Sequence, residues 1–310
     1  MTRRAAAIAK YLVPLIIGFF ITRVIYRNWH QVKEAEWVFD PVFLLLSFAL
    51  TSPWFLLRPW AWSQILRRFG YSLPYNSAYR VVRRAELSRF VPGGIWHYVS
   101  RVYLASQHGV AAPACLAATF VETVILLLAA IVPALWSLDQ ALPFLEAPFR
   151  VLLIVVPLVA LGALHPKVLN FWVGFVARRL KQPHAGLHIR WRNLVGLWLL
   201  FLMIWLTYGL SAGLFIRGIL LVPGDELPVF SSNYVLAWLV GMVTMIAPAG
   251  MGIRDGVLGL LLRGHLGIGA GLTVAVALRL WTTVVEVLWA LGIERIVQRV
   301  SSGDTPETLR

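Results

Sequence analysis

The chain has 310 residues, of which 59% are hydrophobic and 14% charged, and its mean hydropathy is +0.74. This composition is far too apolar for a soluble domain and predicts an all-α integral membrane protein. The net charge is +14, but the basic residues are scattered between long apolar runs, which argues against a nucleic-acid-binding surface. The single cysteine, Cys115, excludes an internal disulfide and a cysteine-cluster metal site. The histidines lack metal-ligand spacing, so no cofactor is expected.

Several apolar segments are long enough to cross a membrane, because a hydrocarbon core of about 30 Å takes roughly 20 residues of helix. The first, residues 11–24, is expected to be a retained span, since basic Arg23 lies where a signal peptide has small residues. The tryptophans, including Trp54, Trp60 and Trp62, are mostly expected at the membrane interfaces. The predicted spans are about 9–26, 41–62, 111–137, 148–165, 193–219 and 267–293.

Two further segments, 77–107 and 231–263, are interrupted near their middle by proline and glycine. We expect both to be broken re-entrant hairpins. The first is too charged to face lipid. A competing count makes each hairpin two full spans, which gives eight helices with the same sidedness.

The distribution of lysine and arginine predicts the orientation, because these residues accumulate in cytoplasmic loops. Residues 167–192 contain basic side chains and no acidic ones, so this segment is expected inside. The loops around Asp139 and around Asp225 lack basic residues between the spans and are expected outside. Both termini are then cytoplasmic, in a multi-pass protein of a bacterial-type cytoplasmic (inner) membrane.

These assignments divide the chain into two halves with the same order of elements. Residues 1–137 and 138–300 each contain two spans, a broken hairpin and one span, and residues 301–310 form a cytoplasmic tail. The first half starts inside and the second outside, so we predict an inverted repeat with oppositely oriented hairpins. Inverted repeats with discontinuous helices are a transporter architecture.

The proline-glycine breaks are the most informative motifs. Proline ends a helix and glycine permits positive φ, so the next half-helix can direct its free N–H groups into a site. Guanidinium groups nearby would suit phosphate, because arginine can bond two oxygens at once. The predicted substrate-binding residues are Arg89, Pro92, Gly93, Gly94, Arg101, Glu122, Pro248, Gly250, Gly252, Arg254, Asp255, Arg279 and Glu286.

Several of these charges have a structural alternative. Glu122 is either a ligand or the ion-pair partner of an arginine. Arg279 and Glu286 are seven residues apart on one helical face, which fits a lined cavity or a structural ion-pair network. A basic group just before the first break has two interpretations as well, a part of the site or an amphipathic helix on anionic headgroups. Its members are Arg80, Arg83 and Arg84.

The two motifs resemble the lysylphosphatidylglycerol synthase transmembrane-region family. The matching stretches are Arg89-Phe90-Val91-Pro92-Gly93-Gly94-Ile95-Trp96 with Arg101-Val102-Tyr103, then Pro248-Ala249-Gly250-Met251-Gly252-Ile253-Arg254-Asp255-Gly256, and Arg279. Members of this family include the flippase half of bacterial multiple peptide resistance factors and stand-alone proteins encoded near glycosyltransferases.

The chain departs from the family pattern at two positions. The second motif, usually Arg-Glu, is Arg254-Asp255 here, which keeps the charge but shortens its reach. Trp96 stands where many members have glycine, so the neighbouring cavity is expected to be narrower or shaped for another lipid. The soluble aminoacyl-transferase domain of two-part members is absent from this sequence, so lipid lysylation is not expected.

The resemblance implies a lipid translocase, not an enzyme, that moves an anionic phospholipid or a polyprenyl-phosphate-linked lipid between leaflets. No GxxxxGK[ST] motif is present, so an ion gradient or the lipid gradient is the expected driving force. The alternative function is an accessory subunit of a glycosyltransferase partner, or a lipid-modifying membrane enzyme. No nucleic-acid partner is expected.

Overall fold

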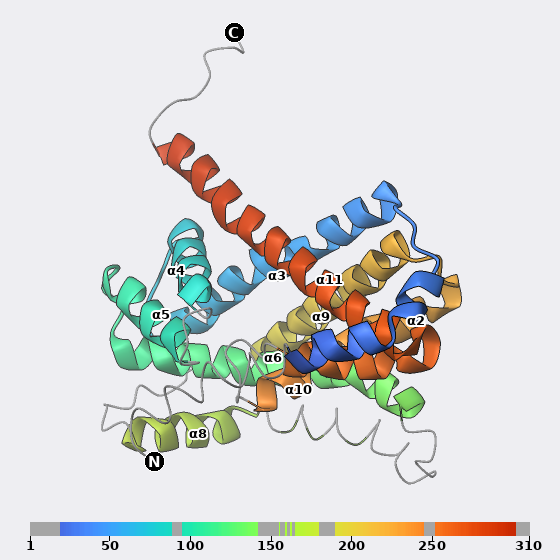
Figure 1. The fold of residues 1–310 in the computed structure, drawn as a ribbon. Coiled ribbons are helices and arrows are strands. Elements are labelled where there is room, and N and C mark those ends of the chain that lie inside the picture. Colours follow the sequence, from blue (N-terminus) through green and yellow to red (C-terminus); the bar gives the residue numbers. More distant parts are fainter. Residues whose placement is uncertain are drawn as a thin grey trace, which may run out of the picture.

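The computed structural model describes residues 19–88, 95–141, 155, 159, 162, 165–179, 190–244 and 252–301. Its elements in these residues are helical, as the all-α prediction requires, and the one β-bridge among them joins Trp37 to Leu220 (Figure 1). The elements are α2 (Trp29–Glu34), α3 (Pro41–Arg67), α4 (Tyr75–Leu87), α5 (Trp96–Ser106), α6 (Ala112–Ala141), α8 (Pro166–Arg179), α9 (Trp191–Ile219), η2 (Gly224–Glu226), α10 (Leu227–Thr244) and α11 (Ile253–Ser301).

Four helices of the described residues are long and apolar enough to cross a membrane: α3, α6, α9 and α11. They coincide with the spans predicted at 41–62, 111–137, 193–219 and 267–293. The other two predicted spans, 9–26 and 148–165, lie mostly outside the described residues. The prediction of a multi-pass helical membrane protein is therefore confirmed.

The start of α3 follows from its local sequence. Asp40 is the N-cap, and its Oδ1 accepts hydrogen bonds from the backbone N–H groups of Val42 at 2.9 Å and Phe43 at 3.3 Å. Pro41 occupies the first helical position, where its missing N–H costs nothing. These two residues fix the start of α3.

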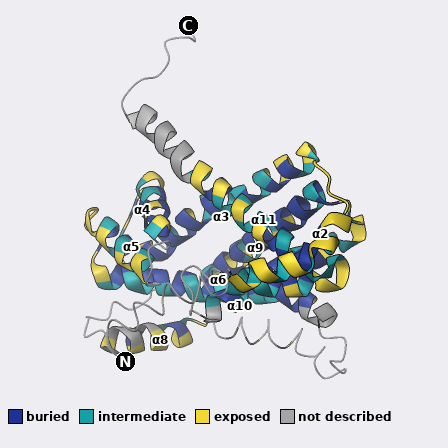
Figure 2. Cartoon of the chain, in the orientation of Figure 1, coloured by how far each residue is buried: buried dark blue, intermediate teal, exposed yellow. Residues whose placement is uncertain are grey.

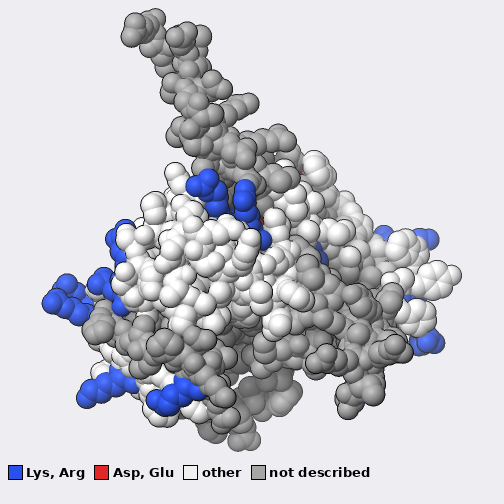
Figure 3. All heavy atoms as spheres, turned by 90° about the vertical axis from the view of Figure 1, so that its left-hand side faces the viewer, with Lys and Arg blue, Asp and Glu red and all other residues white. Residues whose placement is uncertain are grey.

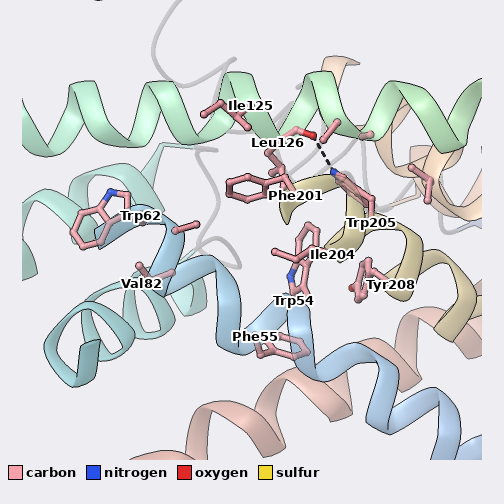
Figure 4. Close-up of a cluster of buried hydrophobic side chains, with 14 of the residues drawn as sticks. Trp54, Phe55, Trp62, Val82, Ile125, Leu126, Phe201, Ile204, Trp205 and Tyr208 are labelled. Atoms are coloured by element: carbon pink, nitrogen blue, oxygen red, sulfur yellow. Dashed lines mark hydrogen bonds between the residues drawn. The ribbon is translucent and has the colours of Figure 1, made fainter. Parts of the chain in front are cut away.

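The core forms where α3, α6, α9 and α10 pack together. Figure 4 shows its aromatic centre, in which the Trp205 Nε1–H donates to the Leu126 carbonyl at 2.9 Å. The Trp54 ring packs edge-on against Trp205 at 4.9 Å. Trp54 and Trp62 are thus buried core residues and not interface anchors as predicted, because α9 and α6 cover the face of α3 that carries them. Trp60 is exposed.

Small residues bring α9 and α10 close together. Gly209 and Gly213 lie one turn apart on α9, in the Gly-x-x-x-Gly spacing that lets membrane helices approach. A Cβ atom at Gly213 would lie 2.6 Å from the Ser231 Oγ, and one at Gly209 would lie 2.9 Å from the Ser231 carbonyl oxygen. Neither position has room for a side chain.

The helix α11 reverses direction at Gly267, whose φ of +74° favours glycine. A Cβ atom at Gly259 would lie 3.1 Å from the Cα of Leu272. In a continuous helix, thirteen residues would separate these positions by about 20 Å. The contact therefore requires two packed helical sections, residues 253–266 and 268–301.

The first section of α11 pairs with α10 in an antiparallel arrangement. At one end, His265 Nδ1 lies 3.1 Å from Glu226 Oε1, just before α10. At the other end, a Cβ atom at Gly241 would lie 2.9 Å from the Cβ of Arg254. The helices α10 and the first section of α11 thus correspond to the predicted segment 231–263. The proline-glycine tip between them, at 245–251, lies outside the described residues.

The helices α4 and α5 pack against each other at one side of the molecule (Figure 1). The Ser88 and Ser100 hydroxyls, 2.7 Å apart, join them. Their tip, residues 89–94, is also outside the described residues. Figure 2 shows α4 with buried and exposed residues along its length. Its buried face packs on α3 and carries charged side chains, which places charge inside the protein.

Candidate functional site

Five charged side chains from α3, α4, α5 and α6 meet in the interior, and we call them the first-half ion cluster: Arg58, Arg83, Glu86, Arg101 and Glu122. Arg58 bridges the two carboxylates, with Nη1 2.8 Å from Glu86 Oε1 and Nη2 3.1 Å from Glu122 Oε1. Arg101 Nη1 lies 2.5 Å from Glu122 Oε2. All five residues are buried. Buried charges at this density require mutual pairing or a ligand.

The local packing positions Arg101 at this cluster. Its guanidinium lies 5.3 Å from the Trp62 ring centroid, and Nη1 is within 3.5 Å of the Thr119 Oγ1. Thr119 is one turn before Glu122 on α6, so both polar groups face the same way. The indole N–H of Trp62 donates to the Thr119 Oγ1 at 3.3 Å. Arg101 is therefore held between an aromatic ring and a carboxylate.

Arg83 is the least satisfied member of the cluster. Its Nη1 lies 3.0 Å from Glu86 Oε2, and its guanidinium lies 5.1 Å from the Phe55 ring centroid. Its other two nitrogens, Nε and Nη2, are buried and make no hydrogen bond. Burial lowers the pKa of the Arg83 guanidinium, and the opposing effect of Glu86 is smaller. The cluster thus contains N–H donors that its own carboxylates do not satisfy.

The same side of α4 contacts the end of α11. The Tyr79 hydroxyl donates to the Trp289 carbonyl at 3.0 Å. Burial raises the pKa of Tyr79 to about 12, against a smaller lowering by Arg83, so this hydroxyl remains a donor at neutral pH. The Trp289 ring stacks on Phe55 at 6.4 Å. We call this contact between α4 and α11, lined by Tyr79 and Trp289, the α4–α11 seam.

A second arginine site lies between α10 and α11. The Arg254 guanidinium lies 4.5 Å from the Tyr234 ring centroid, and the residue as a whole is half-buried. Within the described residues it makes no salt bridge to a carboxylate. The adjacent Asp255 instead accepts a hydrogen bond from the Gly252 backbone N–H at 3.1 Å. Asp255 is the third residue of α11, so this bond is the carboxylate half of a capping box.

Aromatic rings connect the two arginine sites. Arg58 lies 4.6 Å from the Trp54 ring centroid, and Trp54 stacks on Tyr208 at 4.5 Å with an interplanar angle of 14°. Tyr208 contacts Tyr234 edge-on at 5.4 Å, and Tyr234 lies beneath Arg254. The two guanidinium groups therefore stand at opposite ends of a continuous buried aromatic series.

The structure places the predicted site residues in three groups. It brings together Arg101 and Glu122, and it places Arg254 beside Asp255 on another helix. Glu286 is buried on α11, where its charge acts on Arg83, and Arg279 lies two turns before it. Gly252 precedes α11 with φ +83°. The remaining predicted residues lie outside the described residues: Arg89, Pro92, Gly93, Gly94, Pro248 and Gly250.

Sequence reasoning missed two members of the cluster, Arg58 and Glu86, and left Arg83 between two alternatives. Arg58 is an isolated charge inside an apolar run, and such a residue marks a functional or paired site in a membrane helix. Glu86 follows Arg83 by three residues, a spacing that places both on one helical face. Both signals were present in the sequence. Arg83 is buried against α3 and does not rest on the outer surface.

Figure 3 shows the face of the molecule formed by the left-hand side of Figure 1, where α4, α5 and α8 lie. Lysine and arginine side chains are visible on it and acidic ones hardly at all. The acidic partners are instead inside, since Glu86 and Glu122 are buried whereas Arg67, Arg68 and Arg84 are exposed. On this face, therefore, basic residues lie on the surface and the acidic ones lie beneath it, paired with arginines.

The family model for the lysylphosphatidylglycerol synthase TM region matches residues 7–290, which include both arginine sites. The chain belongs to this family. No individual protein in the search of curated proteins matches it. The membership accounts for the membrane helices and covers the first-half ion cluster, Arg254 and both proline-glycine breaks.

Proposed function

We propose that this member of the lysylphosphatidylglycerol synthase transmembrane-region family is a lipid translocase. Its cargo would be an anionic phospholipid or a polyprenyl-phosphate-linked lipid. The observation that supports the proposal is the presence, inside a membrane protein, of arginine N–H donors that the neighbouring carboxylates do not fully satisfy. Arg254 is a half-buried residue whose guanidinium lies over Tyr234, and Arg83 is buried with no hydrogen bond to its Nε and Nη2 nitrogens. Phosphate is the lipid group that such donors suit best.

The proposed mechanism uses two re-entrant hairpins of opposite orientation. The order of elements supports it. The helix α3 is followed by α4, α5 and α6, and Gly109 with φ +76° stands before α6. The helix α9 is followed by α10 and the two sections of α11, with Gly267 at φ +74° between those sections. In this proposal each unit of four helices, preceded by one further span, makes up one half of an inverted repeat, and the headgroup passes between the two arginine sites.

The acidic residues have a defined part in this mechanism. Glu122 neutralises Arg101 and Arg58, so those two arginines position the site and do not bind cargo as strongly as Arg254. Transport requires release as well as binding, and partial neutralisation keeps the phosphate from being held too tightly. The proposed energy source is an ion gradient or the lipid gradient, and the proposed location is a bacterial-type cytoplasmic membrane with both termini inside.

The test is transbilayer movement of fluorescent phosphatidylglycerol in proteoliposomes. The unmodified protein is expected to accelerate flipping over protein-free vesicles. Arg254→Ala is expected to slow it by about tenfold or more, because a charge-assisted hydrogen bond to phosphate is worth roughly 1.5–3 kcal/mol. Arg254→Lys, which keeps the charge but loses the fork of donors, should fall between them.

A matched control is Arg217→Ala. Arg217 on α9 is also partly exposed and lies over an aromatic ring, with its guanidinium 4.8 Å from the Phe43 centroid, but it lies far along the chain from both breaks. Its loss should leave flipping unchanged. Equal rates for Arg254→Ala and the unmodified protein would remove the site from the proposal. No flipping of any anionic lipid by the unmodified protein, together with co-purification of a glycosyltransferase, would favour an accessory role.

A further inference from the structure

The Arg83 guanidinium has buried N–H groups that the protein itself leaves without hydrogen bonds. Nη1 has Glu86 Oε2 as an ion-pair partner at 3.0 Å, whereas Nε and Nη2, like Nε of the adjacent Arg58, make no hydrogen bond. Their carboxylate neighbour Glu86 is shared, since it lies 2.8 Å from Arg58 and 3.0 Å from Arg83. Buried donors are almost always satisfied in native proteins, so several in one place call for an explanation. The simplest is an absent acceptor with several oxygens and a negative charge.

The surroundings of Arg83 favour an amphiphilic acceptor. The Phe55 ring covers the guanidinium, and a low-polarity surrounding strengthens hydrogen bonds to a charged group. Arg83 lies one turn after Tyr79 on α4, so it lies beside the α4–α11 seam. The second section of α11, which contributes Trp289 to this seam, carries exposed apolar side chains: Leu280, Val284, Val287 and Leu288. Unsatisfied polar donors close to an exposed apolar helix face match a headgroup with acyl chains.

We propose that Arg83 and the Nε of Arg58 form a phosphate subsite for a lipid headgroup that enters at the α4–α11 seam. This inference deepens the proposed function by naming where the phosphate binds in the first half of the chain. Arg101 differs from Arg83 because Glu122 already satisfies it at 2.5 Å. The positive site for cargo in this half is therefore Arg83, while Arg101 maintains the fold.

The test measures lipid binding without transport. Purified full-length protein in detergent is heated with dioctanoyl phosphatidylglycerol, with uncharged dioctanoylglycerol, or with inorganic phosphate. Dioctanoyl phosphatidylglycerol is expected to raise the unfolding midpoint of the unmodified protein, and the other two probes are expected to have little effect. Stabilisation by dioctanoylglycerol to the same extent would overturn phosphate recognition. Stabilisation by inorganic phosphate to the same extent would overturn the lipid headgroup as its source.

The decisive variant is Arg83→Met, which removes the donors and keeps an apolar side chain of similar length. Glu86 retains Arg58 in this variant but loses its 3.0 Å ion pair with Arg83, so the lipid-free protein should lose some stability while still folding. Its affinity for dioctanoyl phosphatidylglycerol should fall about ten- to hundredfold. A less stable lipid-free protein with unchanged affinity would make Arg83 a purely structural residue and overturn the proposal.

Two further variants complete the design. Arg84→Met alters the next residue on α4, an exposed arginine, and should leave the affinity within a few-fold of the unmodified value. Arg83→Lys keeps the charge without the fork, so it should bind with intermediate affinity, and it serves if Arg83→Met does not fold. If the unmodified protein binds the lipid through Arg83 but does not flip it, the phosphate subsite is supported and the proposed translocase function is contradicted. Flipping by Arg83→Met at the unmodified rate would remove the inference alone.

Discussion

The two arginine sites of this protein solve the problem of buried positive charge in different ways. In the first half, α3 to α6 enclose a cluster in which Arg58 and Arg101 are bound by carboxylates at 2.5–3.1 Å. In the second half, Arg254 lies over the Tyr234 ring, and the neighbouring carboxylate of Asp255 caps the helix backbone instead. At the first site carboxylates neutralise the arginines, and at the second an aromatic face stabilises the arginine.

This difference suggests a division of labour. A salt bridge whose two partners are both buried is rigid, and removing one partner lowers the stability of the protein considerably. A cation over an aromatic ring keeps its N–H edge available, because the ring contacts only its face. The first site is therefore suited to holding α3, α4, α5 and α6 together, with Arg83 as its least satisfied arginine, and the second is suited to exchanging ligands. The predictions below test this contrast, from the largest effect to the smallest.

Glu122→Ala should have the largest effect on stability. It leaves Arg101 without a carboxylate and Arg58 with only Glu86. Removing one partner of a buried ion pair costs roughly 3–5 kcal/mol, so the free energy of unfolding should fall by this amount. Denaturant unfolding in detergent measures it. Combining Glu122→Ala with Arg101→Met should recover part of the loss, and a double variant that is no more stable than Glu122→Ala would contradict the pairing.

Trp54→Leu should have the next largest effect, because it interrupts the aromatic series between the two arginine sites. Trp54 is buried, stacks on Tyr208 and lies next to Arg58. Truncating such a ring typically costs about 2–4 kcal/mol. Trp60→Leu, an exposed tryptophan on the same helix, is the control and should change the unfolding free energy by less than about 0.5 kcal/mol. Equal losses would mean that burial of Trp54 contributes nothing specific.

The sequence predicted the helices better than it predicted the site. Apolar runs of sufficient length identify α3, α6, α9 and the second section of α11, because spanning a membrane requires about 20 apolar residues whatever the neighbours are. Proline and glycine marked the breaks between α4 and α5 and between α10 and α11. These signals are local, so they can be recognised without knowledge of tertiary contacts.

Contacts between residues on different helices are not local, and the sequence did not predict them. Glu122 meets Arg58, 64 residues away, and Trp54 is buried because α9 covers it, although each looks like an ordinary residue of its own helix. Asp255 looked like a shortened ligand and proves to cap its helix. A charge inside an apolar run indicates that a partner exists but does not say on which helix it lies.

Asp255→Ala tests the second site and should have a moderate effect. It removes the hydrogen bond that the carboxylate accepts from the Gly252 N–H, and loss of a helix cap costs about 1 kcal/mol. Asp255→Glu should be nearly neutral, since glutamate is the usual residue at this position of a capping box. Thermal unfolding in detergent measures both. A loss for Asp255→Ala as large as that for Glu122→Ala would mean that this carboxylate neutralises Arg254 after all.

The smallest expected effect concerns the contact between the two regions. Tyr79→Phe removes the hydrogen bond that joins α4 to the Trp289 carbonyl of α11, and one such bond is worth about 1 kcal/mol. Tyr75→Phe is a matched control on the same helix, because Tyr75 donates to the Leu56 carbonyl at the same distance of 3.0 Å but within the first half. Both variants should lose a similar, small amount of stability. Only Tyr79→Phe should accelerate exchange of dioctanoyl phosphatidylglycerol, since the Tyr79 bond joins α4 to α11 and the Tyr75 bond does not. Equal exchange rates in the two variants would show that the lipid does not enter there, even if Arg83 binds its phosphate.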